Sequence, residues 1–403
     1  MTPQLRRIVP EELERFVAAF RAVFGGQADD QVLARARLRL ETDRAFVGVD
    51  QHGEVVATAG AFSFQMSLPG GGQTGCAGVS MASVRTDHRR QGLLTRLMGL
   101  LFEQARERGE SLAALWASEA PIYGRYGFGP AIPTIELTFE RDHAALQVPA
   151  APGSVELVDR ATARATFPSI RAAVATTRPG MLTRSDGFWD SMLDEEQTGS
   201  TTTGPRQHAL VPGRGYALYR LKPEWTAGAP TGTVEVAELH AHDPEAAAAL
   251  WRFVTDVDLA STTVAGHRPT DDPALAMVRD TVRTRAQFDW ALQVRVLDVA
   301  GALTQRGYAT DGTIVLEVSD AQIPEQDGCW QLRVVDGEAS CTRTSAAPDL
   351  RLGVASLSTV YLGGVRTTQL VAAGRVVEVT PGAASRLDRM LATPFAPWHE
   401  GMF

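Results

Sequence analysis

Apolar and polar positions between residues 79 and 129 follow the order of short strand, turn, helix, strand and aromatic turn. Residues 79–84 form a short apolar run that is typical of a strand. Apolar residues recur at helical spacing within 93–108, which predicts a helix with one buried face. Residues 112–117 read as a second strand, and 122–128 predict a turn and short helix rich in tyrosine and glycine. The pattern predicts a core that mixes strands and helices.

The rest of the chain continues this alternation with a weaker pattern. Between 155 and 290, the spacing predicts helices at 161–175, 188–195 and 244–257 and strands at 216–221 and 234–239. From 291 onward, it predicts strands at 292–297, 313–318, 330–335 and 350–352 and helices at 299–305, 353–362 and 383–390. The strands of this last stretch alternate like those of a sheet.

The length of 403 residues exceeds what one hydrophobic core supports and predicts about two to three domains. Residues 148–153, rich in proline and alanine, indicate a linker. We expect an N-terminal domain at 1–150, a second domain at 151–290 and a C-terminal domain at 291–403.

A basic turn lies where the first strand gives way to the helix that Leu93 opens. It contains Arg89, Arg90, Gln91 and Gly92. A helix start has backbone N–H groups without partners and carries partial positive charge, so it suits a pyrophosphate. Gly92 would let phosphates approach the backbone, and the arginines would neutralise their charge. The alternative is an ordinary basic helix start after a loop.

This order of elements resembles the core of the GNAT superfamily of N-acetyltransferases. Arg89, Gly92 and Leu94 occupy its Gln/Arg-x-x-Gly-x-Gly/Ala pattern, with Leu94 departing from it at the last position. The resemblance implies acetyl-CoA as co-substrate, without a metal. The expected contacts are Ala82, Ser83 and Val84 for the pantetheine, Arg90, Gln91, Gly92, Leu93, Leu94 and Thr95 for the pyrophosphate, and Ser118 and Glu119 for the thioester end.

The aromatic turn supplies a candidate general acid. Tyr123 and Phe128 match the tyrosine and phenylalanine of the GNAT motif that follows the second strand, where the tyrosine is commonly the acid. A phenol is protonated near neutral pH and can give its proton to the leaving CoA thiolate. Ordinary packing under a loop is the alternative for Tyr123 and Tyr126, and the spacing to Phe128 favours Tyr123.

Four segments resemble the Eis (enhanced intracellular survival) family of actinobacterial acetyltransferases across nearly the whole chain. They are PIYGRYGFGPA, GYALYR at 215–220, RGYATDGTIVLEVSD at 306–320 and YLGG at 361–364. The resemblance implies an α/β (α+β) protein with two tandem GNAT-like domains, each a mixed sheet with flanking helices, and a C-terminal sterol-carrier-protein-like domain. The second domain is expected to bind no cofactor, because residues 240–243 offer no Arg-x-x-Gly turn.

The chain ends PFAPWHEGMF, so Phe403 carries both an aromatic ring and the α-carboxylate. In Eis-like enzymes this terminal carboxylate is the base, which implies the same role for Phe403. A substrate ammonium has a pKa of about 10 and must lose a proton before it attacks. A frayed terminus is the alternative. Met402 stands where the family pattern has an acidic residue, and Glu400 or His399 are candidates to compensate.

The resemblance implies acetylation of aminoglycosides and related polyamines at one or several amines, with protein lysines as further candidates. Residues 24–31 and 62–72 are expected to shape the pocket. A homohexamer is the family precedent. Two alternatives stay open, namely a lipid-binding or assembly protein with a regulatory acetyl-CoA site, and an acetyltransferase of an unrelated small metabolite.

The composition of the chain limits the classes of binding partner that we expect. The net charge is −8, and Lys222 is the only lysine, which argues against bulk nucleic-acid binding and is compatible with steering a polycationic amine. The sequence has no run of about 18 apolar residues and no signal peptide. We therefore expect a cytoplasmic protein without a membrane partner. Cys76, Cys329 and Cys341 show no metal spacing and are expected to be free thiols.

Overall fold

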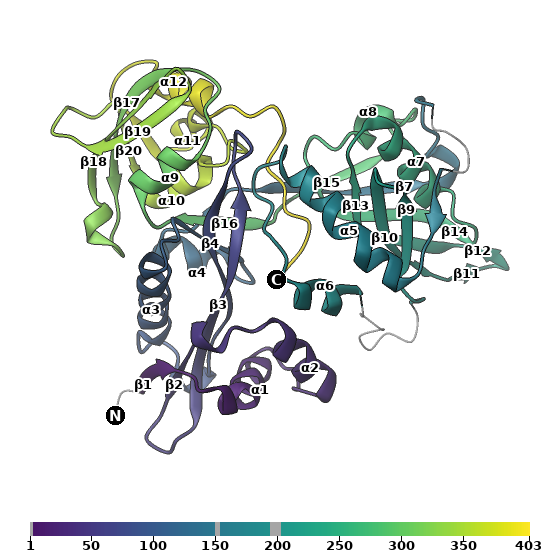
Figure 1. Ribbon diagram of the computed structural model, residues 1–403, viewed down its shortest axis with the longest axis horizontal. Helices are drawn as coiled ribbons and strands as arrows, with labels where there is room; N and C mark the ends of the chain where they lie inside the picture. Colours follow the sequence, from purple (N-terminus) through teal and green to yellow (C-terminus); the bar gives the residue numbers. More distant parts are fainter. Residues whose placement is uncertain (1–2, 150–153, 194–202) are drawn as a thin grey trace. The chain divides into compact units, whose positions relative to one another are not determined.

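The computed structural model describes residues 3–149, 154–193 and 203–403 (Figure 1). The chain divides into two compact units. The first comprises Met1–Ile132, Leu292–Pro394 and Met402–Phe403, and the second comprises Pro133–Ala291 and Phe395–Gly401.

The N-terminal part of the first unit is built on a seven-stranded sheet with the order β1-β2-β3-β4-β5-β16-β6. Its strands are β1 (Gln4–Arg7), β2 (Ala45–Val49), β3 (Val55–Ser67), β4 (Gln73–Val84), β5 (Leu112–Trp116), β16 (Leu292–Val296) and β6 (Gly129–Pro130). Its helices are α1 (Leu13–Val23), α2 (Asp30–Arg39), α3 (Leu93–Glu107) and α4 (Ala120–Tyr123). The predicted helix is confirmed as α3, whose buried face includes Leu97, Met98, Leu101 and Ala105.

Two strands belong to sheets that the sequence pattern does not indicate. The pattern places residues 292–297 with the C-terminal sheet, whereas β16 pairs with β5 of the first sheet. In the other direction, β7 (Pro133–Glu140) pairs with strands of the second unit. Alternating polarity predicts that a segment is a strand, but the choice of neighbour depends on contacts distant in sequence.

The second unit is also built on a seven-stranded sheet, with the order β15-β7-β14-β13-β10-β9-β8. The other strands of this sheet are β8 (Glu156–Leu157), β9 (Gln207–Val211), β10 (Gly215–Lys222), β13 (Gly232–Ala241), β14 (Ala260–Pro269) and β15 (Arg285–Trp290). The helices are α5 (Arg160–Ala175), α6 (Asp186–Leu193), α7 (Pro244–Thr255) and α8 (Ala274–Met277). The predicted helix at 188–195 corresponds to α6, and residues 194 and 195 lie outside the described residues.

The C-terminal part of the first unit has a five-stranded sheet with the order β19-β18-β17-β20-β21. Its strands are β17 (Gly312–Ser319), β18 (Gly328–Val335), β19 (Glu338–Arg343), β20 (Leu350–Gly353) and β21 (Val376–Glu378). Its helices are α9 (Val299–Gln305), α10 (Val354–Val360), α11 (Thr367–Ala372) and α12 (Ala383–Leu391). The short strands β19 and β21 were not predicted.

The three cysteines are free, as predicted, and Cys76 and Cys341 are buried. Burial raises the pKa of Cys341 to about 12 and that of Cys76 well above its usual range, so both thiols stay protonated packing groups. None of the described helices combines the length and the apolar character needed to cross a membrane.

Candidate active site

The centre of the first sheet opens along β4. This strand pairs in parallel with β5 only where residues 76–78 face 112–114, and from there to Val84 it is paired with β3 alone. On its other edge the register with β3 shifts between Thr58 and Gly60, and Met81 adopts a positive φ of 51°. Beyond residue 78, the open edge of β4 therefore offers backbone groups that can pair with an extended amide-containing ligand.

The turn before α3 has the geometry of an anion site. Gly92 is the N-cap of this helix and has a φ of 74°. Because glycine has no side chain, it cannot cap the first N–H groups of the helix. Arg90 also has a positive φ, of 63°. The N–H groups of the first helical turn are therefore left for a ligand, in a region of partial positive charge.

The corresponding helix of the second unit is closed to an anion. Asp243 caps α7, and its carboxylate accepts a hydrogen bond from the Ala246 N–H at 3.0 Å. Arg214 binds the same carboxylate at 2.6 Å. Because a carboxylate already occupies the anion position, α7 offers no comparable place for a pyrophosphate.

Almost all of the predicted cofactor residues meet in one cavity of 490 Å³. Ten of them line it, namely Ala82, Ser83, Val84, Arg90, Gly92, Leu93, Leu94, Thr95, Ser118 and Glu119. Gln91 is exposed and does not line it. Val23, Phe24, His88 and Arg125 also line the cavity, although the sequence did not mark them as cofactor contacts.

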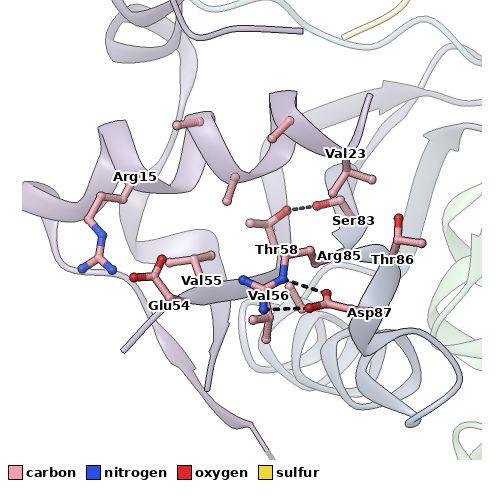
Figure 2. A pocket seen from close by; sticks show the side chains of 14 residues that line it. Arg15, Val23, Glu54, Val55, Val56, Thr58, Ser83, Arg85, Thr86 and Asp87 are labelled. Atoms are coloured by element: carbon pink, nitrogen blue, oxygen red, sulfur yellow. Dashed lines mark hydrogen bonds and ion pairs between the residues drawn. The ribbon is translucent and has the colours of Figure 1, made fainter. Parts of the chain in front are cut away.

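The side chain of Ser83 faces a neighbouring cavity of 690 Å³, shown in Figure 2. There its hydroxyl lies 2.7 Å from that of Thr58, which also donates to the Met81 carbonyl at 2.8 Å. An ion pair between Arg85 and Asp87, 2.8 Å apart, stands at the edge of this cavity. Ser83 therefore lines both cavities, and its hydroxyl is hydrogen-bonded to Thr58.

Tyr123 ends α4 and is buried, with 8% of its surface exposed. Burial raises the pKa of Tyr123, and the neighbouring Tyr126 and Glu119 raise it further, so the phenol keeps its proton. The hydroxyl of Tyr126 lies 3.2 Å from that of Thr95. The two tyrosines of this turn therefore differ, since Tyr126 is tied to α3 while Tyr123 lines the cavities on both sides of it.

A second cavity of 230 Å³ adjoins the first. Both are lined by Phe24, Ala82, Ser118 and Tyr123. Further lining residues of the second cavity include Phe20, Ser80, Trp116, Met402 and Phe403.

The terminal residue is held in this second cavity by the strands β3 and β4. The ring of Phe403 lies 5.0 Å from that of Phe64 and 6.2 Å from that of Phe62, measured between centroids. The Ser80 hydroxyl donates to an oxygen of the Phe403 carboxylate at 3.3 Å. Phe62 and Phe64 lie in the range 62–72 that was expected to shape the pocket. The sequence pattern gave no signal for the role of Ser80, because its approach to the terminus depends on the sheet.

Glu400 and His399, the candidates to compensate for the missing acid at position 402, are buried in other surroundings. Glu400 is buried and forms ion pairs with Arg171 and Arg184 in the second unit. His399 is also buried, and burial lowers its pKa to about 4. Met402 lines the second cavity and is 71% exposed. The charge of Glu400 is thus neutralised by arginine and cannot replace an acid beside Phe403.

Comparison with known families agrees with this architecture. One acetyltransferase (GNAT) domain model matches residues 4–131, another matches 180–296, and a sterol carrier protein domain model matches 299–400. The fold and the cavities therefore define a GNAT-type N-acetyltransferase with two such domains and a sterol-carrier-like domain, as predicted.

Comparison with individual proteins identifies the family within this class. The chain is 37% identical to an uncharacterized N-acetyltransferase of Streptomyces avermitilis, over 99% of each chain. It is 34% identical to the N-acetyltransferase Eis of Mycobacterium tuberculosis, over 89% of each. The crystal structure of Eis1 from Mycobacterium abscessus superposes with a TM-score of 0.88 at 29% identity, covering 99% of this chain and 100% of that one. The chain belongs to the Eis family of GNAT N-acetyltransferases, and this membership supports acetyl-CoA as its co-substrate.

Proposed function

We propose that the enzyme transfers the acetyl group of acetyl-CoA to an amine of an aminoglycoside or related polyamine, within a ternary complex. The observation that carries this proposal is the meeting of two cavities at Tyr123, one beside the α3 turn and the other containing Phe403. A donor in the first cavity and an amine in the second would meet at a phenol and a carboxylate.

The donor half follows from backbone geometry. The pantetheine amides would pair with the open edge of β4, and the pyrophosphate would bind at the N-terminus of α3. A backbone N–H in the Ala82 region would polarise the thioester carbonyl, because the pairing of β4 with β5 ends at residue 78 and leaves that edge of the strand open.

The transfer step uses one base and one acid. The ammonium of the acceptor gives a proton to the Phe403 carboxylate, and the neutral nitrogen attacks the thioester carbon. The carboxylate passes this first proton to solvent and accepts the second proton of the nitrogen as the amide forms. The C–S bond breaks, and Tyr123 gives its proton to the departing sulfur. The products are the acetylated amine and CoA. A proton shift from the carboxylate to the phenolate, through water, restores the resting enzyme.

The second cavity suits a cationic acceptor. Its lining includes the aromatic rings of Phe20, Phe24, Trp116 and Phe403. Aromatic faces attract ammonium groups, and the net charge of −8 favours the approach of a polycation.

The test measures thiol release from acetyl-CoA with a panel of aminoglycosides and an acceptor peptide. The full chain is compared with a chain lacking Phe403 and with one whose terminal carboxylate is converted to an amide by protein ligation, which keeps the ring. We expect turnover by the full chain and a large loss in both variants, with CoA binding retained. Equal turnover by the variants would overturn the carboxylate as base. Binding of acetyl-CoA without turnover of any amine would favour the alternative of a lipid-binding or assembly protein with a regulatory acetyl-CoA site.

Assembly and location are proposed on family precedent. A homohexamer would appear in multi-angle light scattering as six times the chain mass of 43.3 kDa. We also propose that the enzyme works in the cytoplasm, where acetyl-CoA is made, without a nucleic-acid or membrane partner.

A further inference from the structure

The chain leaves the first unit at Pro394, runs through the second unit as Phe395–Gly401, and ends in the first unit with Met402–Phe403. Backbone and side-chain hydrogen bonds hold the middle of this tail. The Trp398 N–H donates to the Pro179 carbonyl at 2.8 Å, and the Trp398 indole donates to the His267 carbonyl at 2.6 Å. The guanidinium of Arg268 lies 4.7 Å from the centre of the Trp398 ring.

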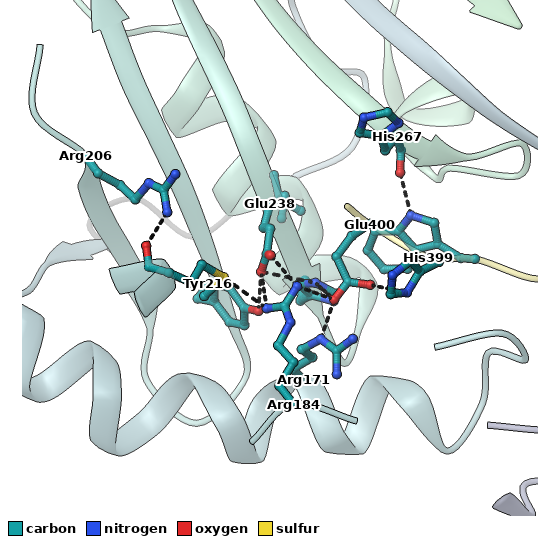
Figure 3. A network of polar contacts seen from close by, with 12 residues as sticks. Arg171, Arg184, Arg206, Tyr216, Glu238, His267, His399 and Glu400 are labelled. Atoms are coloured by element: carbon teal, nitrogen blue, oxygen red, sulfur yellow. Dashed lines mark hydrogen bonds and ion pairs between the residues drawn. The ribbon is translucent and has the colours of Figure 1, made fainter. Parts of the chain in front are cut away.

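Glu400 carries the last charged side chain of the tail and lies in a buried network, shown in Figure 3. One of its carboxylate oxygens accepts from Arg171 and, at 2.7 Å, from Arg184. Arg184 also binds Glu238 at 2.5 Å, and Glu238 accepts from the Tyr216 hydroxyl at 2.9 Å. Two guanidinium groups thus face two carboxylates, and the network is neutral.

A metal site is an alternative interpretation of the same buried residues. Glu238, His240 and Glu400 bring ligand atoms to within 4.8 Å of one another. Both carboxylates, however, are already neutralised by arginine, and Arg184 bridges them. A divalent cation added there would leave an uncompensated buried charge, which is strongly unfavourable. The network is therefore better explained as an anchor for the tail than as a metal site.

The terminus itself lies within the first unit. Its carboxylate accepts a hydrogen bond from the Ser80 hydroxyl at 3.3 Å, and its neighbour Met402 is largely exposed. Only Gly401 and Met402 separate the anchored Glu400 from Phe403, so the chain can carry the carboxylate only a short distance from where the anchor sets it.

We propose that Glu400, held by Arg171 and Arg184, is a positioning residue that fixes the Phe403 carboxylate at the acceptor amine. The second GNAT domain, whose helix α7 is closed to phosphate, would then serve the reaction by holding the tail. This inference rests on the proposed function, in which that carboxylate is the base.

The first readout is independent of activity. Carboxypeptidase A removes C-terminal aromatic residues, and its rate on a folded chain follows the population in which the terminus is free. We expect Phe403 to leave Glu400→Gln roughly tenfold faster or more than wild type. The matched control is Glu224→Gln, which removes a charge from an exposed position of the same unit and should release Phe403 at the wild-type rate.

The second readout separates positioning from binding. Because a small misplacement of a reacting group costs roughly 10- to 100-fold in rate, kcat of Glu400→Gln should fall by that factor. The KM for acetyl-CoA should not change, since the donor cavity is built from the first unit.

A third variant separates positioning from stability. Glu400→Gln leaves two arginines facing Glu238 alone, whereas the double variant Arg171→Gln/Glu400→Gln restores a neutral network. We expect the double variant to recover most of the melting temperature but to keep the fast release of Phe403 and the low kcat. Recovery of all three would mean that the network only stabilises the fold, and would overturn the proposal.

The remaining outcomes distinguish this inference from the proposed function. If deletion of Phe403 abolishes turnover while Glu400→Gln keeps wild-type release and wild-type kcat, the positioning role is wrong and the base survives. If deletion of Phe403 leaves turnover intact, the terminal base is wrong, and with it the catalytic meaning of the anchor.

Discussion

Tyr123 and Tyr126 stand three residues apart in one turn, but only Tyr123 lines both cavities, while the Tyr126 hydroxyl faces Thr95. We predict that Tyr123→Phe lowers kcat by roughly 10²- to 10⁴-fold, the usual contribution of a general acid. Tyr126→Phe should cost far less, with a loss of about 1 kcal/mol in stability from its hydrogen bond. Thiol release and thermal unfolding of the two variants, measured together, test this. Equal losses of kcat would remove Tyr123 from the role of acid.

Gly78 makes room for the terminus. A Cβ at this position would lie 2.2 Å from the Phe64 ring and 3.1 Å from that of Phe403. We predict that Gly78→Ala displaces both rings and lowers kcat roughly tenfold or more, while acetyl-CoA still binds. Gly99, exposed on α3, has no atom within 4 Å of such a Cβ. Gly99→Ala should keep full activity and add roughly 0.5–1 kcal/mol of stability. Steady-state kinetics with isothermal titration of CoA would show whether the two glycines differ in this way.

The site residues that the sequence could supply are those that share a short segment. Gly92 and Tyr123 were predicted because a turn or a motif fixes their neighbours within a few positions. Phe403 was predicted because an aromatic end is unusual and because Eis-like enzymes use such a terminus as the base. Ser80 could not be found, since its contact with Phe403 spans 323 residues, and neither could the pairing of Arg171 with Glu400 across 229 residues. Contacts of this kind depend on tertiary structure and leave no periodic signal in a single chain.

At the scale of elements, the start of α3 is the feature most open to test. Gly92 has open space around a hypothetical Cβ but a φ of 74°. An alanine there would be strained by roughly 1–2 kcal/mol in its backbone rather than by any clash. We predict that Gly92→Ala weakens acetyl-CoA binding by roughly tenfold and leaves kcat at saturation almost unchanged, because the reacting atoms lie away from the turn. A fall in kcat without a change in affinity would argue against α3 as the phosphate site.

Several helices and central strands were predictable, whereas other strands, including β2, β3, β9 and β14, and the partners of the strands were not. The helices α3, α5 and α7 and the strands β5, β10 and β13 follow their predicted positions closely, because each buries one face at a regular spacing. The exposed strand β15 carries no alternation of burial, so its pattern held no strand signal. Likewise, β7 and β16 each pair in a sheet built mainly from another part of the sequence, and alternation alone cannot indicate that.

At the scale of the molecule, the tail makes the stability of the second unit relevant to the site in the first. His399 precedes Glu400 and is buried beside Glu400, Arg171 and Arg184. Burial lowers its pKa from 6.5 to about 4, with the two arginines adding to the shift and Glu400 opposing it. The folded state therefore binds a proton less readily than the unfolded state. Stability supplied by the neutral imidazole is present above pH 6.5 and is lost as the pH falls from about 6.5 to about 4.

We predict that acidification over this window destabilises the second unit by about 3 kcal/mol through His399. Glu400, whose burial opposes ionisation but whose pKa the arginines hold well below its usual range, should lose its contribution only at lower pH. Hydrogen exchange of α5, measured from pH 7 to pH 4, reports the opening of this unit without depending on the protonation of any acceptor amine. His399→Asn should reduce the dependence, while the buried His240, whose pKa burial also lowers, accounts for part of the remainder. The exposed His52→Asn should leave it unchanged. If the wild-type profile stays flat down to pH 4, the imidazole does not limit the unit. A steep profile in which faster release of Phe403 accompanies faster exchange in α5 would instead show that the domain without a phosphate site governs the position of the terminal carboxylate.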